Sequence, residues 1–232
     1  MFIGHTAAAF AAKKAAPQIR LGTLLLAAQF ADLIFPLFVL LGVEHVMPAP
    51  GITAFTPYDF YDYPISHSLA ANIVWAFIFA GIYFFKLREW TGTFILAGVV
   101  LSHWVLDFIS HRPDMPVAPG LQLCVGLGLW NSIAWTIIIE SCMFALGVYL
   151  YLRATTAVDR TGSLALWSFI GLQVLLYIGD IVGKTPVGGH TMALFSLLQW
   201  LIVPWGYWID RHRHIQPQPV RHQVEHFSFP GK

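Results

Sequence analysis

The feature that most constrains the fold of this chain is a series of long apolar segments. Six segments are long enough, or nearly so, to cross roughly 30 Å of hydrocarbon: residues 21–43, 68–85, 91–110, 129–152, 163–182 and 192–209. A seventh, residues 5–16, is too short to cross at about 1.5 Å per helical residue. Only 11% of the 232 residues are charged, against about 25% in soluble domains. The sequence therefore predicts an all-α, polytopic membrane protein with about six transmembrane helices and a short N-terminal half-helix.

The charges predict the domain organisation and the topology. We expect one helical membrane domain over residues 1–210, followed by a basic cytoplasmic tail that contains His and Pro over residues 211–232. If both termini are cytoplasmic, all but two of the 13 Lys and Arg residues lie on the cytoplasmic side, the exceptions being Arg112 and Lys184. The net charge of +1 gives no reason to expect a nucleic-acid partner. The expected partner is the lipid bilayer, and nothing in the sequence indicates an oligomeric state.

Ionisable residues recur at regular intervals near the end of the third apolar segment. His103, Asp107 and His111 are spaced four apart, so a helix places them on one face. Burying such groups in hydrocarbon costs several kcal/mol unless they meet a partner, a cavity or a metal. Imidazole nitrogens and carboxylate oxygens are ligands that Zn²⁺ uses. We therefore expect a metal site here, the alternative being a hydrogen-bonded His–Asp pair between helices.

The calculated depth in the membrane places further residues in the same layer as His103. At about 1.5 Å per residue, groups on four segments reach a layer roughly 14–18 Å from the membrane faces: His5, Asp32, His103 and Glu140. The same calculation places His67 near the outer mouth unless its helix is tilted or deeply set. The candidate ligands of the metal are His5, Asp32, His67, His103 and Asp107.

Short motifs over roughly residues 1–145 together resemble the bacterial membrane-bound metal-dependent hydrolase family. They are Gly4-His5, Gln29-Phe30-Ala31-Asp32, Tyr63-Pro64-Ile65-Ser66-His67-Ser68-Leu69, and Ser102-His103-Trp104-Val105-Leu106-Asp107 with the following His111-Arg112-Pro113-Asp114. Leu129-Trp130-Asn131-Ser132 and the later Glu140 also fit that family. The resemblance implies a multi-pass protein of the bacterial inner membrane that hydrolyses its substrate with a metal.

That family is in turn similar to zinc-dependent phospholipase C, whose ligands follow the order His, Asp, His and His-x-x-x-Asp. The five candidate ligands reproduce that order, which implies zinc as the cofactor and a phosphoester, in a lipid or free, as the substrate. The chain departs from the family at residues 31–34, where Asp32 stands alone in place of a Pro-Asp-x-Asp motif. A single acid leaves fewer carboxylates to bridge metals, which disfavours a site with several zinc ions.

If the chain is such a hydrolase, a bound metal would activate water as a Lewis acid. Glu140 or His111 would transfer the proton, and Arg112 would orient the phosphate. Two other functions remain open. The same His, Asp and Glu residues suit the relay of a transporter or proton-coupled permease, and a polar layer that only locks helix packing would also require them.

Overall fold

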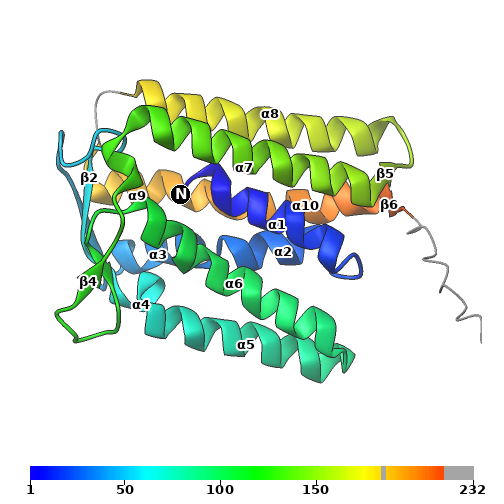
Figure 1. Ribbon diagram of the computed structural model, residues 1–232, viewed down its shortest axis with the longest axis horizontal. Coiled ribbons are helices and arrows are strands. Elements are labelled where there is room, and N and C mark those ends of the chain that lie inside the picture. The colour runs from blue at the N-terminus through cyan, green and yellow to red at the C-terminus, as the bar shows by residue number, and fades with distance from the viewer. Residues whose placement is uncertain (184–186, 217–232) are drawn as a thin grey trace, which may run out of the picture.

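The computed structural model describes residues 1–183 and 187–216 as a bundle of α-helices with short strands in the connecting loops (Figure 1). The helices are α1 Ile3–Ala15, α2 Leu21–Ala28, α3 Phe30–Leu40, α4 Pro64–His67, α5 Leu69–Leu87, α6 Trp90–Ser110, α7 Ile133–Ala154, α8 Arg160–Val182, α9 Gly189–Ser196 and α10 Ile202–Arg211. Three antiparallel strand pairs join β1 His45–Pro48 to β2 Tyr58–Asp62, β3 Met115–Pro116 to β4 Cys124–Val125, and β5 Thr155–Ala157 to β6 Arg213–Ile215.

The chain is a multi-pass helical membrane protein, as the sequence predicted. Helices α5, α6, α7 and α8 are each long and apolar enough to span a membrane, and so is the continuous helical stretch Gly189–Arg211. The first predicted span, residues 21–43, is not a straight helix, because α2 and α3 meet at Gln29 with a bend of 56°. The side chain of Gln29 is buried at this bend and donates a hydrogen bond to Thr6 Oγ1 over 3.1 Å.

The connecting segments gather at the two ends of the bundle (Figure 1). The α1–α2 and α5–α6 turns and the β5–β6 pair lie at one end, and the β1–β2 and β3–β4 pairs lie at the other. This arrangement agrees with the uneven distribution of Lys and Arg, although the side of the membrane that each end faces stays a prediction. Within the predicted tail, Arg213–Ile215 is strand β6 and pairs with β5. Residues 217–232 of the predicted tail lie outside the described residues, as does Lys184.

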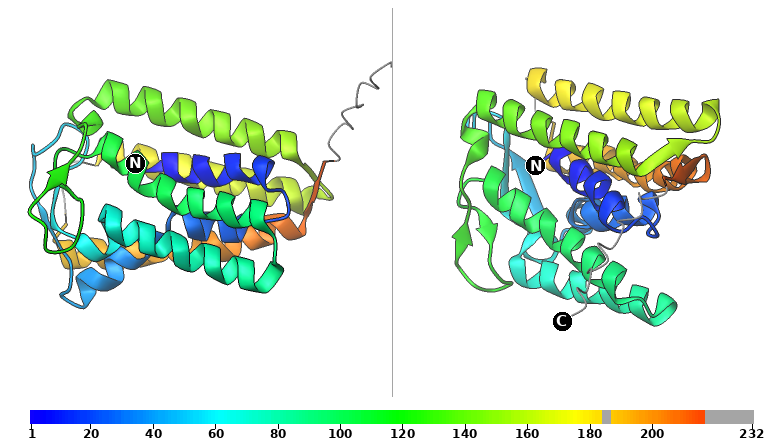
Figure 2. Two further views of the ribbon diagram at one scale, coloured as in Figure 1. Left: turned by 60° about the horizontal axis from the view of Figure 1, so that its bottom comes forward. Right: turned by 45° about the vertical axis from the view of Figure 1, so that its right-hand side comes forward.

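The N-terminal half-helix α1 lies inside the bundle, between α7, α2 and α6 (Figure 2). Its alanine-rich sequence favours a helix, and small residues allow its backbone to approach that of α7. A Cβ atom added at Gly147 of α7 would lie only 2.7 Å from the carbonyl oxygen of Ala7. Close backbone approach through small residues is the usual basis of helix association in membranes, so the sequence of α1 suits a buried position.

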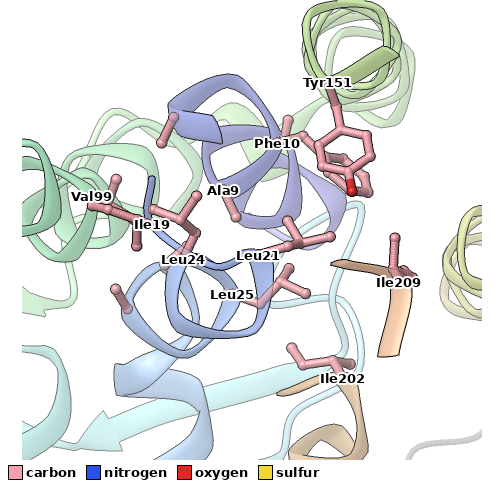
Figure 3. Close-up of a cluster of buried hydrophobic side chains, with 14 of the residues drawn as sticks. Ala9, Phe10, Ile19, Leu21, Leu24, Leu25, Val99, Tyr151, Ile202 and Ile209 are labelled. Carbon is pink, nitrogen blue, oxygen red and sulfur yellow. The ribbon is translucent and has the colours of Figure 1, made fainter. Parts of the chain in front are cut away.

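Helices α1, α2, α6, α7, α8 and α10 share an apolar core (Figure 3). The ring of Phe10 lies 5.0 Å from the ring of Tyr151 and 6.0 Å from that of Phe169, measured between centroids. Lipid tails are as apolar as Leu, so these contacts stabilise the bundle through van der Waals packing and not through removal of surface from water. The outward faces carry exposed apolar side chains, including Phe77, Phe94, Leu164 and Leu175, as lipid contact requires.

A buried ion pair fixes the end of α1 to α10. The ammonium group of Lys13 donates to Asp210 Oδ2 over 2.9 Å and to the carbonyl of Ile19 over 2.8 Å. Asp210 also accepts hydrogen bonds from the backbone N–H of Leu21 and the hydroxyl of Tyr151. Four segments of the chain therefore meet at one carboxylate, which holds α1 in place.

Candidate metal centre

Helix α6 contributes the first two residues of the site. His103 and Asp107 are one turn apart on α6, and His103 Nε2 lies 3.0 Å from Asp107 Oδ2. Both side chains are buried, and the carbonyl of Ala28 lies 2.8 Å from His103 Nδ1. Ala28 is the last residue of α2, and the final carbonyls of a helix have no partner within it. The bend between α2 and α3 therefore supplies the acceptor that orients His103.

Helix α1 brings His5 onto the same face. The rings of His5 and His103 are stacked, with centroids 3.9 Å apart and planes at 9°. His5 Nε2 lies 3.0 Å from Asp107 Oδ1, the carboxylate oxygen that His103 does not use. The α-amino group of Met1 also contacts this oxygen. Asp107 of α6 therefore contacts both His103 on its own helix and the N-terminal segment that carries Met1 and His5.

His67 and Asp32 complete the group. His67 Nε2 lies 3.4 Å from His103 Nε2, 3.4 Å from Asp32 Oδ1 and 3.8 Å from Asp107 Oδ2. Asp32 is in the first turn of α3, directly after the bend, and its Oδ1 lies 3.8 Å from His103 Nε2. The structure thus brings together the five predicted ligands from α1, α3, α4 and α6.

The expectation that His67 lies near the outer mouth is wrong. That depth assumed that His67 belongs to the second span, but the backbone is extended at Ser68, with φ −70° and ψ 151°. His67 therefore ends the separate four-residue helix α4 and does not follow the axis of α5. Because α4 also packs against α3, His67 reaches the same place as His103.

The cluster is closed on most sides. The side chains of four members are between 1% and 6% exposed, whereas that of Asp32 is 30% exposed. Asp32 is therefore the member of the cluster that is most accessible from outside. Two overlapping triads have ligand atoms close enough to hold a metal ion: His5, His103 and Asp107, and Asp32, His67 and His103.

The hydrogen-bond partners of two imidazoles assign their tautomers. His103 Nδ1 faces a carbonyl oxygen, which only accepts, so Nδ1 carries the proton. His67 Nδ1 lies 2.6 Å from Ser66 Oγ, and that hydroxyl lies 2.6 Å from a carboxylate oxygen of Glu44. Since the hydroxyl donates to the carboxylate, it accepts from His67 Nδ1. When a ring is neutral, its Nε2 then has a lone pair, and the lone pairs of the two rings face each other beside two carboxylates.

Glu140 lies beside the site and binds the first residues of α1. Its Oε2 accepts from the backbone N–H of Phe2 over 2.8 Å and from that of Gly4 over 3.4 Å. The first N–H groups of a helix have no partner within it, so this carboxylate satisfies two of them and fixes the end of α1 that carries His5. Within residues 1–183 and 187–216, the buried Oε1 atom of Glu140 has no hydrogen-bond partner.

His111 and Arg112 are not part of the cluster. Helix α6 ends at Ser110, and His111 has extended φ and ψ. The side chain of His111 therefore does not lie on the helix face that carries His103 and Asp107. His111 Nδ1 pairs instead with Asp114 Oδ1 at 3.1 Å and lies 3.3 Å from the hydroxyl of Tyr63. Burial, and then the Asp114 carboxylate, raise the pKa of that hydroxyl well above its usual range. Arg112 forms ion pairs with Asp59 and Asp114.

Sequence reasoning missed Glu44 and Ser66. Glu44 lies between α3 and β1, where no periodic pattern distinguishes a buried acid from a solvated one. Ser66 precedes His67 directly and therefore carried a signal, as a hydroxyl next to a candidate ligand.

Comparison of the chain with protein-family models, curated proteins and solved structures gives no match. The geometry of the site is therefore the evidence on which a function is proposed.

Proposed function

We propose that this chain is a metal-dependent hydrolase that binds zinc within the membrane and acts on a phosphoester, in a lipid or free. One observation carries the proposal: His67 Nε2 and His103 Nε2, each with a lone pair, lie 3.4 Å apart beside the carboxylates of Asp32 and Asp107. Lone pairs and anions that face one another in a buried site are stabilised by a cation between them, which a metal ion bound to these four groups would supply.

The spacing of these atoms supports zinc. Tetrahedral Zn²⁺ with ligands at about 2.0–2.2 Å separates neighbouring ligand atoms by about 3.3–3.6 Å. The five distances recorded among the four ligand atoms are 3.0, 3.4, 3.4, 3.8 and 3.8 Å. Two of these distances lie within that range, and the other three lie 0.2–0.3 Å outside it. His5 lies on the other oxygen of Asp107, where it orients the carboxylate or adds a further ligand.

Each residue then has a role in hydrolysis. A bound zinc ion would lower the pKa of a water molecule toward neutrality and polarise the phosphoryl oxygen. Glu140 Oε1 accepts the proton of the water molecule as the new P–O bond forms, and returns it to the leaving alkoxide as the ester P–O bond breaks. Because Arg112 is already neutralised by two carboxylates, we assign it no contact with phosphate. The family resemblance supports a location in the bacterial inner membrane, and the uneven distribution of Lys and Arg supports cytoplasmic termini.

The test is hydrolysis of a chromogenic phosphodiester and of a phospholipid by the purified protein in detergent micelles. We expect turnover that EDTA abolishes and zinc restores. The Glu140→Gln variant should retain zinc but turn over about 10²–10⁴-fold more slowly, the usual contribution of a general base. Turnover that survives complete removal of metal, or no phosphoester turnover by the zinc-loaded protein, would contradict the proposal.

The second candidate is a proton-coupled transporter, which the bend between α2 and α3 favours. Broken spans that place polar residues near the midplane are common in transporters, and Asp32 follows such a break directly. Reconstitution into proteoliposomes separates the two functions. Proton flux that persists without metal and is lost in Glu140→Gln would support transport and argue against the hydrolase.

A further inference from the structure

Glu44 is a buried carboxylate that the proposed reaction does not use. Its side chain is fully buried, and no Lys, Arg or His of the described chain lies within ion-pair distance of it. Burying an isolated carboxylate costs several kcal/mol. The compensation comes from three donors: the backbone N–H groups of Ile65 and Ser66, at 2.7 and 2.8 Å, and Ser66 Oγ, at 2.6 Å.

The three donors define the direction of the hydrogen bonds that follow. An ionised carboxylate only accepts, so the single hydroxyl proton of Ser66 points at Glu44. Ser66 Oγ must then accept from His67 Nδ1, 2.6 Å away. This leaves the lone pair of His67 on Nε2, the nitrogen that faces His103 and Asp32. The orientation and tautomer of His67 are therefore set from Glu44, two hydrogen bonds away.

We infer that Glu44 is a positioning residue that, through Ser66, holds His67 in the tautomer that can bind a metal. This inference rests on the proposed metal site and adds a residue to it. Partners that orient a metal-binding imidazole typically contribute a factor of about 10–100 to metal affinity. Glu44 and Ser66 form such a pair, and both come from outside the membrane-spanning helices.

The variant Glu44→Gln tests this relay, the hydrogen-bond chain that runs from Glu44 through Ser66 to His67. A carboxamide has only one acceptor oxygen, so it cannot accept from all three donors. With its oxygen on the two backbone N–H groups, its NH₂ group donates to Ser66 Oγ and turns the hydroxyl proton toward His67 Nδ1. His67 then carries its proton on Nε2 and loses the lone pair that would bind metal. We expect metal-free Glu44→Gln to show His67 protonated at Nε2 and to bind zinc about 10–100-fold more weakly than the unaltered chain.

The measurement is ring-nitrogen NMR on ¹⁵N-histidine-labelled full-length protein in micelles, together with zinc titration. The His67 signals are assigned by their loss in His67→Gln. The matched control is Glu89→Gln, because Glu89 also accepts two backbone N–H groups, those of Thr91 and Gly92, at the start of a helix. This control should leave both the nitrogen shifts of His67 and the zinc affinity unchanged.

An unchanged tautomer in Glu44→Gln, or a zinc affinity equal to that of the control, would overturn the inference. If Glu44→Gln fails to fold, Ser66→Ala keeps the backbone contacts of Glu44 and removes only the hydroxyl. His67 should then sample both tautomers and bind zinc more weakly, and unchanged behaviour would again overturn the inference. A chain without zinc affinity would contradict the proposed function, whereas the shifts of the metal-free protein would still test the relay.

Discussion

Replacing His103 by Ala is expected to abolish tight zinc binding. His103 is the one residue that belongs to both triads able to hold a metal ion within the described chain. Its Nε2 atom lies within 3.8 Å of candidate ligand atoms from Asp32, His67 and Asp107. The substitution therefore removes the central ligand of the site. We expect zinc affinity to fall by more than the roughly 10–100-fold that follows loss of an outer partner, and phosphoester turnover to fall with it.

Metal content after dialysis and isothermal titration with zinc check this prediction. His190→Ala is the control, since His190 lies on the exposed surface of α9 and should leave both quantities unchanged. Size-exclusion profiles and helical circular dichroism show whether His103→Ala still folds. A folded His103→Ala protein that retains zinc as the unaltered chain does would exclude His103 as a ligand.

The second large effect concerns stability. Asp210→Ala should lower the free energy of unfolding by about 3–5 kcal/mol, because removing one partner of a buried ion pair leaves the other charge uncompensated. Lys13 is only 4% exposed, and without Asp210 its ammonium group keeps, among the described residues, only the carbonyl of Ile19 as a hydrogen-bond partner. The backbone N–H of Leu21 and the hydroxyl of Tyr151 would lose an acceptor as well.

Reversible unfolding in mixed micelles measures this loss. Asp62→Ala provides the contrast, since the Asp62–His45 pair is more than 40% exposed on both sides and such pairs contribute about 0–1 kcal/mol. Lys13→Met combined with Asp210→Leu should recover part of the stability lost in the single variant, because neither charge of this buried pair then remains. Equal, small effects of Asp210→Ala and Asp62→Ala would show that the buried pair does not fix α1.

The sequence predicted those parts of the site that depend on one straight helix. The spacing of four between His103 and Asp107 placed both on one face of α6, and the rise per residue along α1 brought His5 to their layer. Asp32 lies after the bend at Gln29, so its position beside them does not follow from this calculation. The same reasoning was wrong for His111, because α6 ends before it, and for the depth of His67, because Ser68 separates α4 from α5. A depth calculated from the rise per residue is valid only where the helix is continuous and straight.

Tertiary contacts account for the rest. The bend at Gln29 could not be read from local sequence, because Gln29 is neither Gly nor Pro and its hydrogen-bond partners come from α1 and from Gln199. Glu44 was missed because its role depends on Ser66, 22 residues later, and such pairings leave no periodic pattern in one sequence.

X-ray absorption at the zinc edge tests the central claim most directly. The protein is loaded with a single equivalent of zinc in micelles, and His103→Ala is the reference. We predict a spectrum of about four nitrogen and oxygen neighbours at about 2.0–2.2 Å, with outer scattering from more than one imidazole ring that is lost in the reference. A chain that retains no zinc, or zinc surrounded by water oxygens without imidazole scattering, would contradict the account.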